Sequence, residues 1–264
     1  MKSNNPVLNR EFATFREAPA SAATLQGMYD GPTTSVDQRV MTLDDVIVKT
    51  GILFVILVAT AVAGWQLINA APAAVFVSAI AAFVVGMIVS AQRSTRPPLI
   101  MVYAALEGVF LGGISNWYQN SKYINPNDGN IVAQAVIGTL VCFGVMLVLY
   151  KSGRLRATPR FQKMMAIALV SYLMIAIGSL ISALFGVGDG WGFYGVGPLG
   201  IALCVIGVAL AAFTLVLDFD LIERGIAAQV PEKESWRASF GLMVTLVWLY
   251  LELLRLLAIL NRSN

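Results

Sequence analysis

Two carboxylic acids, Asp218 and Glu252, stand in strongly apolar stretches of a 264-residue chain that contains no histidine. An ionisable side chain at membrane depth is costly compared with an apolar one, so such a residue is by default a candidate for function. Because histidine is the usual group that titrates near neutral pH, its absence leaves proton or cation chemistry to carboxylates. These two acids are therefore the first candidates for a functional site.

The first acid lies in the string LVLDFDLIERG, where Asp220 follows Asp218 by two positions. On a helix about 200° separates two such residues, so they cannot share one face. Asp220 has Arg224 four positions later, which predicts an ordinary ion pair near the end of the helix. Asp218 has no basic residue three or four positions away, so it must face water, face another helix or be protonated.

The second acid lies in the string WLYLELLRLLAIL, and Arg255 follows Glu252 by three positions on the same helix face. One interpretation is a self-neutralised pair that locks a helix bundle. In the other, Arg255 serves other partners and Glu252 pairs with Asp218. Two nearby carboxyls in a low dielectric do not both ionise, so that pair would hold a proton near neutral pH. It could then switch a helix contact or take up a cation such as calcium.

A third acid, Glu107, lies roughly 12 Å into another apolar stretch, at 1.5 Å per helical residue. The sequence leaves open whether its carboxyl is a hydrogen-bonded structural group or lines a cavity. Beside it, Gly108 and Gly112 have the GxxxG spacing that lets two membrane helices approach closely. We interpret this spacing as packing within the molecule.

Three further sequence patterns are weaker evidence for a functional site. The glycine-rich residues 186–200 match GxGxxG twice, but the matches lie between two apolar stretches and lack the strand–helix setting of a dinucleotide site. The GxGD string of intramembrane aspartyl proteases ends at Asp189, but this residue falls in a predicted outer loop, whereas such an enzyme needs two apposed membrane aspartates. Gly197-Pro198-Leu199 is also a poor substitute for the Pro-Ala-Leu string of those enzymes. Cys142 and Cys204 belong to no CxxC or Cys/His set and are expected to pack in the membrane. We therefore expect no enzyme.

The elements that must position the acids are membrane helices. The chain is 58% hydrophobic and 12% charged, whereas soluble domains carry about 25% charged residues. Basic residues form no aromatic-interleaved stripe, so nucleic acid is not an expected partner. Seven apolar stretches have about the 20 residues that a spanning helix needs, which predicts an all-α integral membrane protein. They lie at about 47–69, 73–91, 99–117, 131–150, 163–185, 198–222 and 239–260.

The distribution of charge predicts the orientation. Lys and Arg number five before and at the start of the first stretch, two after the second, five after the fourth and three after the sixth. The other side has only Lys122 and Arg262. The positive-inside rule therefore places the N-terminus in the cytoplasm and the C-terminus outside. Aromatic residues near the predicted outer ends are expected to lie at the membrane interface. They are Trp117, Tyr118, Tyr123, Trp191, Phe193 and Tyr194.

The organisation has two parts. Residues 1–42 are polar, contain no signal peptide and are expected to form a flexible cytoplasmic tail. Residues 43–264 are expected to form the seven-helix transmembrane domain. The string GIAAQVPEKESWR at 225–237 predicts a long connection between the last two helices.

Residues 43–260 resemble the Bax inhibitor-1 family, including its bacterial YccA-like members. The family carries Tyr-Asp-Thr-Gln late in its sixth span, and Leu217–Asp220 reads Leu-Asp-Phe-Asp, so only the aspartate is kept. The family carries Leu-Tyr-Leu-Asp followed by Leu-Leu-Arg in its seventh span. Residues Leu249–Arg255 match this string with glutamate in place of aspartate, and Glu107-Gly108 also fits the family.

The resemblance implies a seven-transmembrane helix bundle with the seventh helix central, multi-pass in the bacterial inner (plasma) membrane. It further implies a pH-sensitive calcium leak gated by Asp218 and Glu252, with Arg255 as counter-charge and Glu107 as a possible cavity residue. A cation, calcium foremost, is expected at the two acids as transported or bound ion, and no cofactor is expected. The alternative is a non-conducting regulator that binds a membrane protease or another membrane partner through the tail. Glutamate at 252 is one methylene longer than the family's aspartate, which could alter proton sharing.

Overall fold

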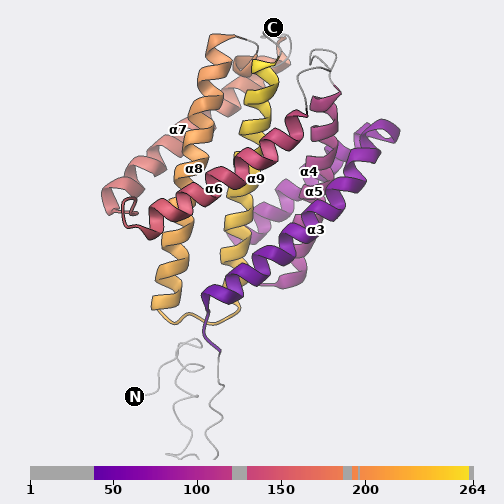
Figure 1. Cartoon of the computed structure of the whole chain (residues 1–264). Coiled ribbons are helices and arrows are strands. Elements are labelled where there is room, and N and C mark those ends of the chain that lie inside the picture. The colour runs from indigo at the N-terminus through magenta and orange to yellow at the C-terminus, as the bar shows by residue number, and fades with distance from the viewer. Residues whose placement is uncertain (1–38, 121–129, 187–191, 196, 262–264) are drawn as a thin grey trace, which may run out of the picture. The chain divides into compact units, whose positions relative to one another are not determined.

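The computed structural model describes residues 39–120, 130–186, 192–195 and 197–261, and Figure 1 shows their arrangement. The described part consists of seven long α-helices and one short 3-10 helix, η2 (Gly192–Tyr194). All seven α-helices are long and apolar enough to cross a membrane, which confirms the predicted all-α, seven-span architecture. The helices are α3 (Leu43–Ala70), α4 (Pro72–Ala91), α5 (Pro97–Gln119), α6 (Ile131–Lys151), α7 (Pro159–Leu184), α8 (Pro198–Ala227) and α9 (Glu234–Leu260).

The starts of these helices follow from their first residues. Helix α3 begins with a capping box, in which the N–H of Asp45 donates to the Thr42 hydroxyl and the N–H of Thr42 donates to the Asp45 carboxylate. Proline suits the first turn of a helix because the N–H that it lacks has no partner there. Four helices begin in this way, at Pro72, Pro97, Pro159 and Pro198.

Helix α9 is the central element, as the family resemblance implies. It contacts α3, α5, α6 and α8, and Figure 1 shows it between α8 and the group formed by α3, α4 and α5. In its most apolar window 56% of the residues are buried inside the protein, against 17% in α3. A side chain on α9 is therefore surrounded by protein more than one on any other described helix.

Glycines bring α3 and α5 into close contact. A methyl group at Gly108 would lie 2.3 Å from the carbonyl oxygen of Leu57, and one at Gly112 would lie 1.8 Å from that of Ala61. Both distances are far below van der Waals contact, so only glycine fits at these positions. The GxxxG spacing therefore serves packing inside the molecule, as predicted.

The last two helices are closer in sequence than predicted. Helix α8 continues through Ala227 and α9 begins at Glu234, so only residues 228–233 lie between them. The long connection expected at 225–237 is wrong, because good helix formers such as alanine and glutamate extend both helices beyond their apolar parts.

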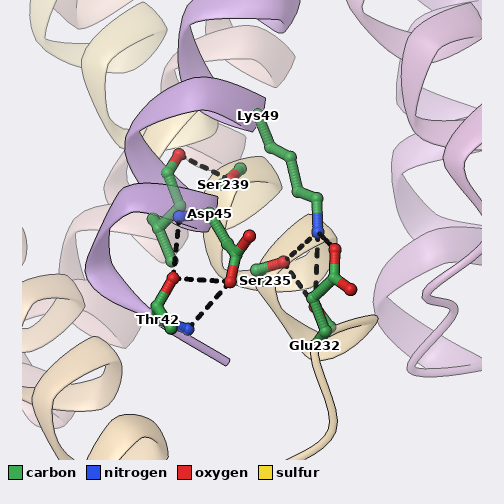
Figure 2. A network of polar contacts seen from close by, with 7 residues as sticks. Thr42, Asp45, Lys49, Glu232, Ser235 and Ser239 are labelled. Carbon is green, nitrogen blue, oxygen red and sulfur yellow. Dashed lines mark hydrogen bonds and ion pairs between the residues drawn. The ribbon is translucent and has the colours of Figure 1, made fainter. Parts of the chain in front are cut away.

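A polar network joins the start of α3 to the start of α9 (Figure 2). The buried Lys49 donates to the Ser235 hydroxyl at 2.6 Å and forms an ion pair with Glu232 at 2.9 Å. One helical turn further along α9, the Ser239 hydroxyl donates to the carbonyl of Val46 at 3.1 Å. We call these contacts the α3–α9 network. They fix the N-terminal end of α3 against the segment that connects α8 with α9.

Candidate functional site

Glu252 lies where α7, α8 and α9 meet, and its residue is only 4% exposed. Its Oε1 accepts two hydrogen bonds, one from the Tyr172 hydroxyl at 2.8 Å and one from the Trp248 ring N–H at 3.1 Å. On α8, a methyl group at Gly207 would lie 2.4 Å from the Tyr172 oxygen and 2.8 Å from Glu252 Oε2. The carboxyl is therefore enclosed by three helices and held by two aromatic donors.

Arg255 is the cation nearest to this carboxyl. Its Nη1 lies 3.7 Å from Glu252 Oε2, which is an ion-pair distance but too long for a hydrogen bond. Oε2 itself is buried and has no hydrogen-bond partner. The guanidinium lies over the Tyr194 ring at 4.6 Å and near the Tyr118 hydroxyl. The sequence left two partners open for Glu252, Asp218 and Arg255, and the structure places Arg255 beside it. Arg255 also contacts Tyr194 and Tyr118.

Asp218 lies on the face of α8 that packs against α9. Its Oδ1 is 4.0 Å from where a methyl group at Gly241 would stand, and Thr245 lies beside the carboxyl one turn later. Apolar residues of both helices, among them Leu215 and Leu246, form the surrounding core. Its Oδ2 is buried without a hydrogen-bond partner. Asp218 is therefore an acid in an apolar helix interface, with one oxygen unsatisfied.

The two acids share the α8–α9 interface but do not meet in it. No hydrogen bond or ion pair joins Asp218 to Glu252, and both residues lie in the described part of the chain. Gly241 and Thr245, which face Asp218, precede Glu252 by two to three helical turns, or roughly 10 to 16 Å. In this conformation the acids therefore occupy two depths. The position of α8 along α9 determines this separation, and the sequence alone does not specify that position.

Glu107 lies on another helix interface. Its carboxyl lies beside the Tyr103 hydroxyl, one turn earlier on α5. The Tyr103 ring packs edge-on against Phe240 of α9, with ring centres 5.0 Å apart. This contact with a packed tyrosine fits the structural interpretation of Glu107, and no hydrogen bond or ion pair in the described part connects Glu107 to the acids on α8 and α9.

Asp220 points away from this interface. It forms the predicted ion pair with Arg224 at 2.8 Å, and Gln162 of α7 lies 3.4 Å from the same oxygen. Asp218 and Asp220 thus contact different helices, as their spacing predicted.

A cleft of about 510 Å³ lies beside Glu252, between α7 and α9. Its polar end is formed by Tyr172, Tyr194, Trp248, Glu252 and Arg255. The rest of its wall consists mainly of small and aliphatic residues of α7. We call it the α7–α9 cleft.

Aromatic residues account for most of what the sequence did not predict at this site. Tyr118 and Tyr194 were expected at the membrane interface but are buried against Arg255. Phe193 and Trp117, which were assigned to the same belt, are exposed. The remaining predicted members of the belt, Tyr123 and Trp191, lie outside the described residues.

Two donors to Glu252 were missed altogether. Trp248 lies four positions before Glu252, so helical spacing could have identified it. Tyr172 comes from α7, eighty positions away, and no local pattern connects it with Glu252. Only the packing of α7 against the bundle reveals this contact.

The remaining candidates from the sequence are the two cysteines, Asp189 and the N-terminal tail, and none of them is observed to contact Glu252 in the described residues. Cys204 is buried in the core near Tyr172, and Cys142 is half-buried; both are free thiols. Asp189 of the GxGD string lies outside the described residues, as does the tail up to residue 38. Within the described ranges, no group of three or more His, Cys, Asp or Glu side chains could hold a metal ion.

Comparison with known families gives one match. The model of a family described as Bax inhibitor 1 like matches residues 5–262 of the chain. A search of curated proteins finds no match. The matched range contains all seven helices and the four residues expected at the site, Glu107, Asp218, Glu252 and Arg255.

Proposed function

Because the chain belongs to the Bax inhibitor 1 like family, we propose that it lets cations, calcium foremost, leak across a membrane in a pH-dependent manner. The proposal takes residues 43–264 as the transmembrane domain and residues 1–42 as a cytoplasmic tail, with the C-terminus on the outer side of a bacterial inner membrane. It assigns gating to Asp218 and Glu252 at two depths of the α8–α9 interface. No catalytic step is part of the proposal.

The observation that supports it best is the environment of Asp218. One oxygen of this carboxyl is buried without a partner, and the neighbouring core is apolar. A neutral acid is tolerated in such a place, whereas a bare carboxylate there lacks the hydrogen bonds and charges that would stabilise it. Ionisation of Asp218 would therefore favour any conformation in which α8 separates from α9 and water reaches the acid.

The interface as it stands leaves little room for an ion. At Gly207 even a methyl group would overlap Glu252, and one carboxyl oxygen of Asp218 is fully buried. Passage along this interface thus requires α8 to move relative to α9. The two acids would then act in sequence along one path, and sharing of one proton between them would need a different helix register.

Calcium suits this path as a passing ion. It takes six to eight oxygen ligands, and a carboxylate supplies two at most. With the two acids two to three turns apart, each could replace only part of a calcium ion's water shell. Weak, successive binding of this kind permits an ion to leave as well as to enter.

The test is calcium flux into liposomes that contain the purified protein, measured with an enclosed calcium dye from acidic to alkaline pH. We expect the leak to be low at acidic pH, where Asp218 is neutral, and to rise as pH rises. Asp218→Asn should keep the leak low at every pH because the side chain cannot ionise. The matched control is Asp220→Asn, since Asp220 pairs with Arg224 and faces α7. If the wild type and Asp218→Asn leak equally at every pH, the proposal is wrong.

A second candidate function is supported by the attachment of the last residues of the tail to the transmembrane domain. The N–H of Met41 donates to the carbonyl of Val230 at 2.8 Å, and Val40 forms an isolated β-bridge with Pro231. A partner bound to the tail could therefore act directly on the α8–α9 connection. A non-conducting regulator of a membrane protease would leave liposomes ion-tight, and its partner would cease to co-purify after deletion of residues 1–38.

A further inference from the structure

The α7–α9 cleft opens toward the surface that faces lipid. Two leucines of α7 line it, Leu173 and Leu180, and these are 57% and 65% exposed. On a membrane-spanning helix, exposed leucines contact acyl chains. The mouth of the cleft is therefore apolar and accessible from the bilayer, while its inner end carries Glu252 and Arg255.

The two charges at the inner end are close without being bonded. Arginine and carboxylate groups in direct contact form hydrogen bonds of about 2.7 to 2.9 Å. Here Nη1 of Arg255 stays 3.7 Å from Oε2 of Glu252, and Oε2 has no hydrogen-bond partner although it is buried. A buried acceptor of this kind is stabilised by a donor that reaches it from the cleft.

The aromatic walls favour a cationic donor. Tyr172, Trp248 and Tyr194 line the cleft beside the carboxyl, and the faces of such rings attract an ammonium group. Arg255 lies over the ring of Tyr194 at 4.6 Å and has five N–H donors for an anion. The inner end thus offers an acceptor for a cation and, next to it, a donor group for an anion.

We propose that the α7–α9 cleft binds a phosphoethanolamine lipid headgroup, with the ammonium on Glu252, the phosphate on Arg255 and the acyl chains leaving past Leu173 and Leu180. A primary ammonium has three N–H donors, so it can hydrogen-bond to Oε2. The quaternary ammonium of a phosphocholine headgroup has none, and a phosphoglycerol headgroup has no cation. The site should therefore distinguish lipids of equal chain length by their headgroups.

This lipid site goes beyond the proposed ion leak and does not depend on it. Binding can be measured on purified protein that conducts nothing. A failure of the flux experiment would leave the lipid proposal intact, and the reverse also holds.

The test is native mass spectrometry of the delipidated protein in detergent, with dioctanoyl phosphatidylethanolamine as probe. We expect it to bind more tightly than the phosphatidylcholine and phosphatidylglycerol of the same chain length, by about tenfold for one hydrogen bond to a charged group. Ala176→Phe should abolish this preference by filling the cleft that Ala176 lines. Ala166→Phe, on the exposed surface of α7, is the matched control.

A variant that fails to fold can be replaced by Ala183→Phe, since Ala183 lines the same cleft. Glu252→Met should bind the three lipids equally, because both the charge and the acceptor that select the primary ammonium are gone. Equal binding of all three lipids to the wild type would overturn the proposal, as would an unchanged preference in the filled variants. Free phosphoethanolamine that binds as tightly as the lipid would show that the occupant is a soluble zwitterion instead.

Discussion

Removal of the Tyr172 hydroxyl is the sharpest test of how Glu252 is held. The hydroxyl donates to Oε1 of this buried carboxyl at 2.8 Å across the α7–α9 boundary. Tyr172→Phe keeps the ring and its packing against Trp248 and Tyr194, so the change is confined to the hydroxyl. Its other acceptor, the Leu203 carbonyl oxygen, lies at 3.5 Å, so the bond to Glu252 is the main one lost. We expect the variant to be less stable than the wild type.

The size of the loss follows from the charge of the acceptor. A hydrogen bond to a charged group contributes about 1.5 to 3 kcal/mol to stability. Because Trp248 continues to donate to the same oxygen at 3.1 Å, the lower end applies, and we expect about 1.5 kcal/mol. This corresponds to roughly a tenfold change in the unfolding equilibrium constant.

The matched control is Tyr250→Phe. Tyr250 is hydrogen-bonded between helices to the hydroxyl of Ser115 at 2.6 Å, and both groups are neutral. Neutral interhelical hydrogen bonds in membranes average about 0.6 kcal/mol, so this variant should lose less than half as much.

The assay is reversible unfolding in mixed micelles of dodecylmaltoside and SDS. The cycle is completed in a Glu252→Met background, where Tyr172→Phe should cost much less, because the acceptor that remains is the Leu203 carbonyl oxygen at 3.5 Å. A Tyr172→Phe loss no larger than that of Tyr250→Phe would refute the reasoning, and so would a loss of equal size in the Glu252→Met background.

Two further predictions concern the packing that supports the site. Lys49→Met should destabilise the protein by about 2 kcal/mol in the same assay, because the ion pair between Lys49 and Glu232 joins α3 to the α8–α9 connection. Most of that loss should disappear in a Glu232→Gln background, where the ion pair is already broken. Additive losses of the two variants would contradict this. Gly112→Ala should cost at least about 3 kcal/mol or prevent folding, since its methyl group would lie 1.8 Å from the Ala61 carbonyl oxygen. The control is Gly144→Ala, which has open space and should stabilise α6 by about 0.5 to 1 kcal/mol.

The helices themselves could be predicted because a membrane imposes a simple requirement. A segment that crosses hydrocarbon must be apolar along about 20 residues and must satisfy its own backbone, which only a helix does in this chain. All seven predicted spans agree with observed helices to within a few residues, except that α8 and α9 extend further toward each other. That exception lies outside the apolar parts, where hydropathy no longer marks the helix end.

The candidate site was predictable only where its contacts are local. The pairs Asp220–Arg224 and Glu252–Arg255 lie within one turn of one helix and were both identified from spacing. The contacts of Glu252 with Tyr172, and of Arg255 with Tyr194, join distant segments. No periodicity in the sequence specifies which helices meet, so these aromatic partners could not be foreseen.

The sequence by itself determined that this protein has seven membrane helices and that carboxylates, in a chain without histidine, are the candidates for its chemistry, because hydrophobic length and residue type are properties of the chain alone. The tertiary structure decided that Asp218 and Glu252 lie at two depths of one interface, with Asp218 facing Gly241 and Glu252 facing Tyr172 and Arg255. The physical reason is that the register of α8 against α9 depends on how glycines and large side chains interlock between helices, which is a property of the packed bundle.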